Sequence, residues 1–209
     1  MTDELCFDHL VRLSTPLGVY EHALHSDPRV EHGMCVDDVA RALVVTAREP
    51  DPSPEVAELA RTCVAFLVAA QHDDGSSHNR RNADGTWADD ASTLDHWGRS
   101  LWALGIAATS SPDPLVSTAA LEGARTALRG RSRWLRSTAY AVLGASALLD
   151  ADPENVTALR LMRESRGTLR RARMDRSWPW PEDSLTYANA VLPQAMLVMG
   201  RHLDASDLR

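Results

Sequence analysis

Residues Glu31–Ala47, EHGMCVDDVARALVVTA, carry the pattern that decides the fold. The second half of this stretch is apolar on nearly every side, and a helix that is apolar all round is buried. A short polar loop containing His32, Cys35, Asp37 and Asp38 runs directly into it. The stretch therefore predicts a buried helix that begins with two carboxylates, which serve either as helix caps or as part of a binding site.

Helices of two kinds alternate along the rest of the chain. After a short helix expected at Asp3–Leu13, apolar helices are predicted from the opening stretch to near Arg48 and at Trp97–Ala108, Leu135–Leu149 and Leu185–His202. Helices with a single apolar stripe, typical of surface helices, are predicted at Pro54–Gln71, Leu115–Leu128 and Asn155–Arg173. We expect about eight helices and no convincing strand.

This alternation is an internal repeat of helix pairs with a period of ~40–50 residues, which is typical of a stacked helical array. We therefore expect an all-α fold in which residues 1–209 form one domain with an inner and an outer helical layer. The links that enter the inner helices are long and polar. In an up-down array they emerge at one rim, beside the positively polarised helix N-termini.

The composition excludes several classes of function. The net charge of −7 argues against nucleic acid and anionic membranes as partners. All 22 basic residues are arginine, which excludes chemistry that requires a catalytic lysine. The three cysteines are too few for a disulfide framework. We find no signal peptide and no membrane-spanning segment in the sequence, and we expect a cytoplasmic protein.

Four polar segments are expected to meet at the rim, and together they combine carboxylates, aromatic rings, amides and arginines. Each precedes a predicted inner helix, and the one before Leu135–Leu149 carries Arg133 and Trp134. Aromatic faces stack on sugar rings while acids and amides bond hydroxyl groups, so this mixture indicates carbohydrate recognition. A pair of carboxylates can also supply the acid and base for glycosidic bond cleavage.

Other interpretations were weighed against this one. Either Asp37 or Asp38 could act only as a helix cap, and so could Asp183. His22, His25, His32 and Cys35 match no common zinc motif, so we expect no metal. A terpenoid role would need a third acid after Asp38. We expect no cofactor.

Four motifs resemble, in the same order, those of a bacterial family of six-hairpin (α/α) toroid domains related to glycosidases. They are HGMCVDDVARAL (32–43), HNRRNADGTW (78–87), DHWGRSLWALG (95–105) and WPWPEDSLTYANAVLPQAML (178–197). Members of this family occur alone or joined to glycosyltransferase domains. Where the family has Asp and Arg, this chain has Ala188 and Val191. About four of the six hairpins are expected here, which implies a partial ring that a second copy or a partner domain completes.

The resemblance and the rim together define the predicted site. The predicted catalytic residues are Asp37, Asp38, Glu182 and Asp183. The predicted sugar-binding residues are His32, Arg41, His78, Asn79, Trp87, Asp95, Arg99, Trp180, Tyr187 and Asn189. We expect Asp37 to cap or orient and Asp38 to face the ligand. Two functions remain open: a glycoside hydrolase-like enzyme, and a non-catalytic glycan-binding or scaffold module that accompanies glycosyl transfer.

Overall fold

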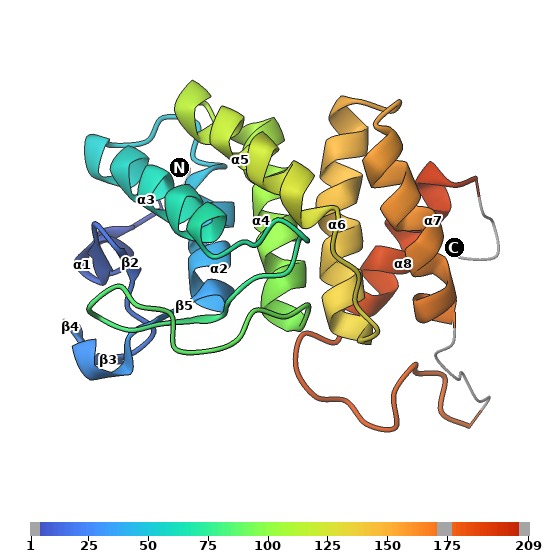
Figure 1. The fold of residues 1–209 in the computed structure, drawn as a ribbon, viewed down its shortest axis with the longest axis horizontal. Coiled ribbons are helices and arrows are strands. Elements are labelled where there is room, and N and C mark those ends of the chain that lie inside the picture. The colour runs from blue at the N-terminus through green and yellow to red at the C-terminus, as the bar shows by residue number, and fades with distance from the viewer. Residues whose placement is uncertain (1–4, 171–176, 205–209) are drawn as a thin grey trace.

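The computed structural model describes residues 5–170 and 177–204, and in these ranges the chain is mostly helical (Figure 1). The helices are α1 (Asp8–Arg12), α2 (Val36–Thr46), α3 (Pro54–Ala69), α4 (Asp95–Ser110), α5 (Pro114–Ala127), α6 (Leu135–Ala151), α7 (Val156–Arg170) and α8 (Val191–His202). This confirms the all-α class. Of the described helices, none combines the length and the apolar character needed to cross a membrane.

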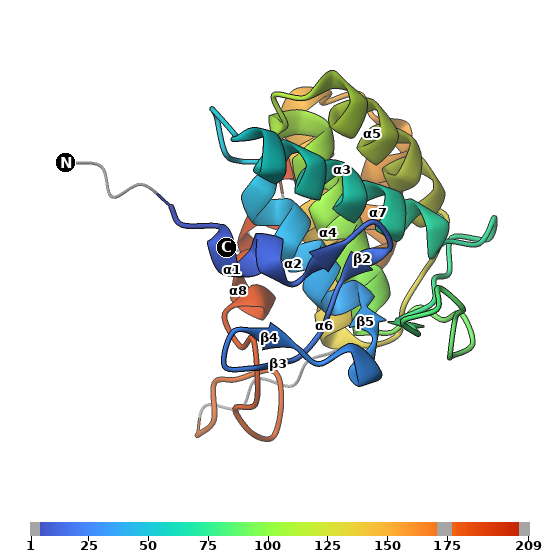
Figure 2. The ribbon, with the colours of Figure 1, turned by 90° about the vertical axis from the view of Figure 1, so that its left-hand side faces the viewer.

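The helices form two layers. In the inner layer α2 packs on α4, α4 on α6, and α6 on α8. In the outer layer α3, α5 and α7 each pack on the inner helix that precedes them in the chain, and α3 also contacts α5. Figure 2 shows α3 and α5 together on one side of α2 and α4. The predicted alternation of inner and outer helices is therefore confirmed for the described part of the chain.

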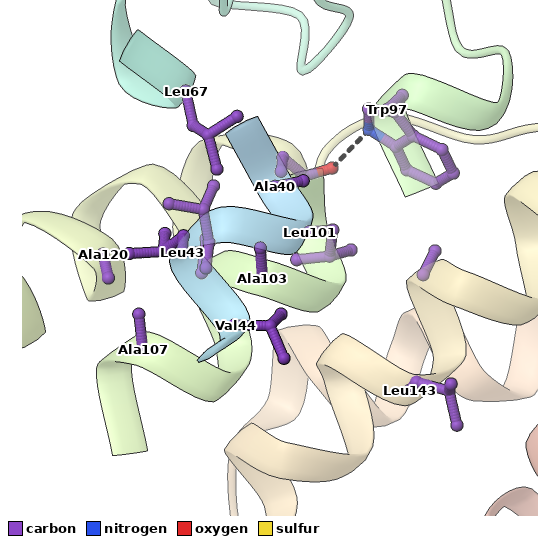
Figure 3. Packing of buried hydrophobic residues seen from close by; sticks show 14 of the residues in the cluster. Ala40, Leu43, Val44, Leu67, Trp97, Leu101, Ala103, Ala107, Ala120 and Leu143 are labelled. Carbon is purple, nitrogen blue, oxygen red and sulfur yellow. Dashed lines mark hydrogen bonds between the residues drawn. The ribbon is translucent and has the colours of Figure 1, made fainter. Parts of the chain in front are cut away.

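The core lies between these layers and is built from aliphatic side chains. Leu43 of α2, Leu67 of α3 and Leu101 of α4 are almost completely buried in it (Figure 3). The indole of Trp97 is buried as well, and its Nε1 donates a hydrogen bond to the carbonyl of Ala127 (3.1 Å). This bond ties the start of α4 to the end of α5, so the rim is anchored to the outer layer.

The two central inner helices, α4 and α6, approach each other through glycines. A Cβ atom on Gly105 would lie 2.4 Å from the carbonyl oxygen of Gly144, and one on Gly98 would lie 2.2 Å from that of Ser137. No side chain fits between backbones at such distances. The close contact aligns the N-termini of α4 and α6 side by side.

Some predicted boundaries are wrong. Helix α1 begins at Asp8 rather than Asp3, and residues 1–4, like the predicted helix end at Arg173, lie outside the described residues. Helix α8 begins at Val191 rather than Leu185, because Ala188 adopts a positive φ of 47° that a helix does not allow. Residues 185–190 therefore belong to the loop before α8.

The structure adds short strands that the sequence did not indicate, and every described strand has only two residues. The pairs are antiparallel: β1 (Ser14–Thr15) with β2 (Gly18–Val19), β3 (Ala23–Leu24) with β4 (Asp27–Pro28), and β5 (Met34–Cys35) with β6 (Arg80–Arg81). Runs this short leave no period-2 pattern in a sequence. The β5–β6 pair joins the entry to α2 to the long segment before α4.

The polar links into the inner helices share one end of the molecule. Figure 1 shows the segments that precede α4, α6 and α8 along the lower edge, together with β5 at the start of α2. The predicted convergence of four polar segments on one rim is confirmed in this respect. Only some of their side chains lie close enough together to line one cavity.

Candidate functional site

An open cavity of about 770 Å³ lies on this rim, where α2, α4 and α6 begin and where the loop before α8 crosses them. Its walls combine three carboxylates, four guanidinium groups and two aromatic rings. The lining residues are Asp37, Arg41, Leu94, Asp95, Arg99, Arg133, Trp134, Leu135, Arg136, Glu182 and Tyr187. Residues more than 140 positions apart in the sequence thus face the same space.

Asp37 and Arg99 form the ion pair on the α2 and α4 side of the cavity. Nη1 of Arg99 donates a hydrogen bond to Oδ1 of Asp37 at 2.8 Å, and the guanidinium carbon lies 5.0 Å from the centre of the Tyr140 ring. Burial lowers the pKa of Arg99, but the Asp37 charge and Tyr140 outweigh it and the pKa is raised overall. The Arg99 guanidinium therefore stays charged.

Arg136 and Glu182 form the second ion pair, on the opposite side of the cavity. Both Glu182 oxygens accept from Arg136, the Oε2 contact at 2.6 Å. The same guanidinium donates to the carbonyl of Tyr187 (2.7 Å), to the hydroxyl of Thr186 (2.7 Å) and to Oδ1 of Asn189 (3.3 Å). One buried arginine on α6 thus fixes the course of the loop before α8.

Tyr187 lies between the two ion pairs. Its ring centre is 5.7 Å from the guanidinium carbon of Arg99 and 4.6 Å from that of Arg136, and its hydroxyl donates to the Asp95 carboxylate. Burial, together with the bond to Asp95, raises the pKa of Tyr187 to about 12. The phenol therefore keeps its proton at neutral pH and can donate it in a hydrogen bond.

Asp38 does not line the cavity, in contrast to the expectation that it faces the ligand. Its carboxylate accepts from Arg41 and, at 3.2 Å, from the thiol of Cys35, which is the N-cap residue of α2. Asp37 is the aspartate that reaches the cavity. The structure therefore places Asp37 rather than Asp38 at the cavity, because the second and third positions of a helix point in different directions.

Glu21, Cys35 and Asp38 bring their ligand atoms within 4.8 Å of one another, and they form the only such group of three potential metal ligands among the described residues. Arg80 donates to Glu21, and Arg41 donates to Asp38. Burial raises the pKa of the Cys35 thiol well above its usual range. These pairings show a closed ion-pair network, which needs no metal for its charge balance.

His78, Asn79 and Trp87 support the segment before α4 and do not line the cavity. The His78 ring stacks on Trp87 with centroids 5.0 Å apart, and its Nδ1 lies 2.6 Å from the carbonyl oxygen of Asp89. The backbone carbonyl of Asn79 accepts from the amide of Val36 (2.9 Å). These residues hold the segment against the start of α2.

The remaining predicted residues also lie outside the lining. Asp183 is exposed, and within the described ranges it makes no hydrogen bond or ion pair. Trp180 packs on the core, and Asn189 stabilises the loop by accepting from the amide of Thr186 (3.1 Å). His32 lies beside His22, with ring centroids 4.8 Å apart. Six of the fourteen predicted residues line the cavity: Asp37, Arg41, Asp95, Arg99, Glu182 and Tyr187.

Sequence reasoning missed Arg136 and did not select Arg133 or Trp134 among the site residues. A signal for Arg136 existed, because an arginine in the first turn of an otherwise apolar helix must find a partner. Arg99 was recognised because a buried arginine on an inner helix needs a partner, and Arg136 is a buried arginine near the start of the next inner helix. Its partners lie 46 to 53 residues away, and sequence alone did not connect them.

Fold and site thus define an all-α, two-layer protein with a charged and aromatic cavity at the N-termini of its inner helices. The chain is similar to the crystal structure of a sugar epimerase from a ruminal bacterium, with a TM-score of 0.67 and 12% sequence identity. The match covers 97% of this chain and 64% of that one. At such low identity the likeness shows the fold alone.

No family model matches the chain, and no curated protein matches it by sequence. The predicted membership of the six-hairpin toroid family therefore stays a prediction. What the structural match supports is a helical fold that also occurs in a carbohydrate-related protein.

Proposed function

We propose that this protein is carbohydrate-active and binds a glycan in the cavity of about 770 Å³ at the inner-helix N-termini. The observation that carries the proposal is the composition of the walls. Aromatic rings at Trp134 and Tyr187 provide surfaces for sugar C–H groups, and fixed carboxylates and guanidinium groups around them provide partners for hydroxyls. A fold shared with a sugar epimerase supports the same class of ligand.

For the architecture, we infer that the two layers are part of an (α/α) toroid of helical hairpins. The described helices supply three inner–outer pairs, α2–α3, α4–α5 and α6–α7, followed by α8. The chain spans 64% of the length of the sugar epimerase that it matches. A second copy or a partner domain that completes the ring would extend the cavity beyond α2 or α8.

Binding is the function that the ion pairs favour over catalysis. Asp37 and Glu182 each bond a buried arginine, which occupies oxygens of these carboxylates inside the protein. Glycosidic cleavage instead requires a pair of carboxyl groups that flank the scissile bond. A non-catalytic glycan-binding module, associated with glycosyl transfer, is consistent with this arrangement.

Glycoside hydrolysis is the second candidate, because one observation specifically favours it. Asp37 and Glu182 line the same cavity, and the protonated phenol of Tyr187 lies between the two ion pairs. Among the four predicted catalytic carboxylates the cavity favours these two over Asp38 and Asp183. In this scheme the protonated phenol of Tyr187 would donate the proton to the leaving group.

The two candidates are separated by measuring binding and turnover on a panel of oligosaccharides. We expect at least one glycan to bind, and we expect Trp134→Ala to weaken it about tenfold, in line with the ~0.5–1.5 kcal/mol of an aromatic contact plus lost buried area. Asp37→Asn tests catalysis, with Asp183→Asn as the control, because Asp183 carries the same group outside the cavity.

Turnover that Asp37→Asn abolishes and Asp183→Asn spares would establish the hydrolase. Binding without turnover in the wild-type protein, in Asp37→Asn and in Asp183→Asn would establish the glycan-binding module. If no glycan binds to the wild-type protein, or if Trp134→Ala leaves glycan binding unchanged, the cavity is not the carbohydrate site.

A further inference from the structure

One cation on the cavity wall, Arg133, has no anionic partner among residues 5–170 and 177–204. Three of the four lining arginines are bonded to carboxylates, namely Arg41 to Asp38, Arg99 to Asp37 and Arg136 to Glu182. Arg133 is exposed, and its one recorded contact within the described residues is with the neighbouring Trp134 ring, 4.7 Å from the guanidinium carbon. It therefore offers a complete guanidinium fork to a ligand.

The helix start beside Arg133 also lacks a negative charge. Asp37 and Asp38 lie in the first turn of α2, and Asp95 lies in that of α4. The first turn of α6 contains no acidic residue, and its N-cap, Trp134, forms no side-chain cap. The partial positive charge of this 17-residue helix is therefore not matched by an acid in its own first turn.

A third observation is independent of that wall. Arg99 is only 7% exposed, and its Nε is buried without a hydrogen-bond partner among the described residues. An unsatisfied charged donor in a buried position is costly unless something else bonds it. Arg99 lines the cavity, so a ligand that enters it also meets the guanidinium group that pairs with Asp37.

We infer that the sugar bound in this cavity is acidic, and that Arg133 and the N-terminus of α6 receive its anionic group while Trp134 contacts its ring. The inference rests on the proposed function and names its substrate class. The shared chemistry is a sugar with a carboxylate or a phosphate. The chain as a whole has a net charge of −7, but within the described ranges this wall carries an unpaired positive charge, which favours an anionic ligand.

The test compares acidic sugars with their neutral counterparts. Uronic acids and hexose 6-phosphates are titrated against the neutral hexoses of the same configuration, and affinities are measured by NMR and by tryptophan fluorescence. We expect the acidic member of a pair to bind about tenfold more tightly, as one charge-assisted bidentate contact provides. That advantage should shrink as salt is raised from low to high ionic strength.

Two arginine variants provide the contrast. Arg133→Gln should remove the preference for the acidic sugar, so that the acidic and the neutral member of a pair bind with similar affinity. Arg48→Gln removes the same charge from an exposed position just beyond the other end of α2, and it should change neither affinity. The uronate and phosphate arms then identify which anion is preferred.

Equal affinity for acidic and neutral sugars, or an Arg133→Gln variant that retains the preference, would overturn this inference and leave the proposed function standing. Absence of binding by every sugar, acidic or neutral, would instead overturn the proposed function, and this inference with it.

Discussion

Replacement of Arg136 by glutamine tests whether one buried arginine holds the loop before α8. The guanidinium donates to Glu182, Thr186, Asn189 and the carbonyl of Tyr187, so the variant loses the hydrogen bonds by which this arginine fixes the loop to α6. The side chains of Arg136 and Glu182 are 9% and 22% exposed, so the loss would leave a largely buried carboxylate without its cation.

Breaking a buried pair by removing one partner costs about 3–5 kcal/mol. Because Glu182 retains some exposure and can be hydrated when the loop moves, we expect Arg136→Gln to lower the free energy of unfolding by about 3 kcal/mol, the low end of that range. The assay is urea denaturation followed by circular dichroism. Chymotrypsin should also cleave the loop faster, because Trp178, Leu185 and Tyr187 are already exposed and a loop released from α6 can bend into the protease.

The matched control is Arg131→Gln, which removes an arginine–glutamate pair from a more exposed place. Arg131 bonds Glu164, and the two side chains are 35% and 42% exposed. We expect this variant to lose about 0–1 kcal/mol, as exposed pairs do. A loss below about 1 kcal/mol for Arg136→Gln, with unchanged chymotrypsin cleavage, would refute the claim that the buried pair organises the site.

Three further outcomes follow from packing and from the pKa shifts. Gly105→Ala should lower the free energy of unfolding by about 2 kcal/mol or more, because the added Cβ meets the backbone of α6. In Gly167→Ala, on α7, the added Cβ meets nothing within 4 Å, so this variant should raise the free energy of unfolding by about 0.5–1 kcal/mol. Urea denaturation measures both changes. Burial lowers the pKa of His202 from its usual 6.5, so the unfolded chain takes up a proton on this histidine at a higher pH than the folded chain does. The free energy of unfolding should therefore fall as the pH drops below 6.5. His202→Gln should make this pH dependence smaller. The pKa of Tyr187 is raised to about 12, so spectroscopic titration should find one tyrosine that ionises near pH 12. The free energy of unfolding should fall as the pH rises above 10, the usual tyrosine pKa, because the unfolded chain then releases this proton first. Tyr187→Phe should remove both effects.

The helical pattern was readable from the sequence because it depends on local periodicity. The outer helix α3 shows a clear apolar stripe, and Ser53 and Pro54 mark its start with an N-cap bond to Val56 (3.3 Å). Such signals act within a few residues, so they need no knowledge of the rest of the chain. The start of α8 was not predicted because the conformation of Ala188 and the anchoring of the loop depend on Arg136, which lies 51 residues before its loop partner Tyr187.

The sequence by itself determined the helical class, the order of inner and outer helices, and the rim on which the polar segments meet. Hydrophobic periodicity and breaker residues suffice for these, since the burial of a helix face follows from its own composition. Only the tertiary structure decided that Asp37 rather than Asp38 faces the cavity, and that His78 and Trp87 support a loop. It also showed that Arg136 joins Glu182 to the site. Those assignments depend on side-chain direction and on partners distant in sequence, which local patterns do not specify.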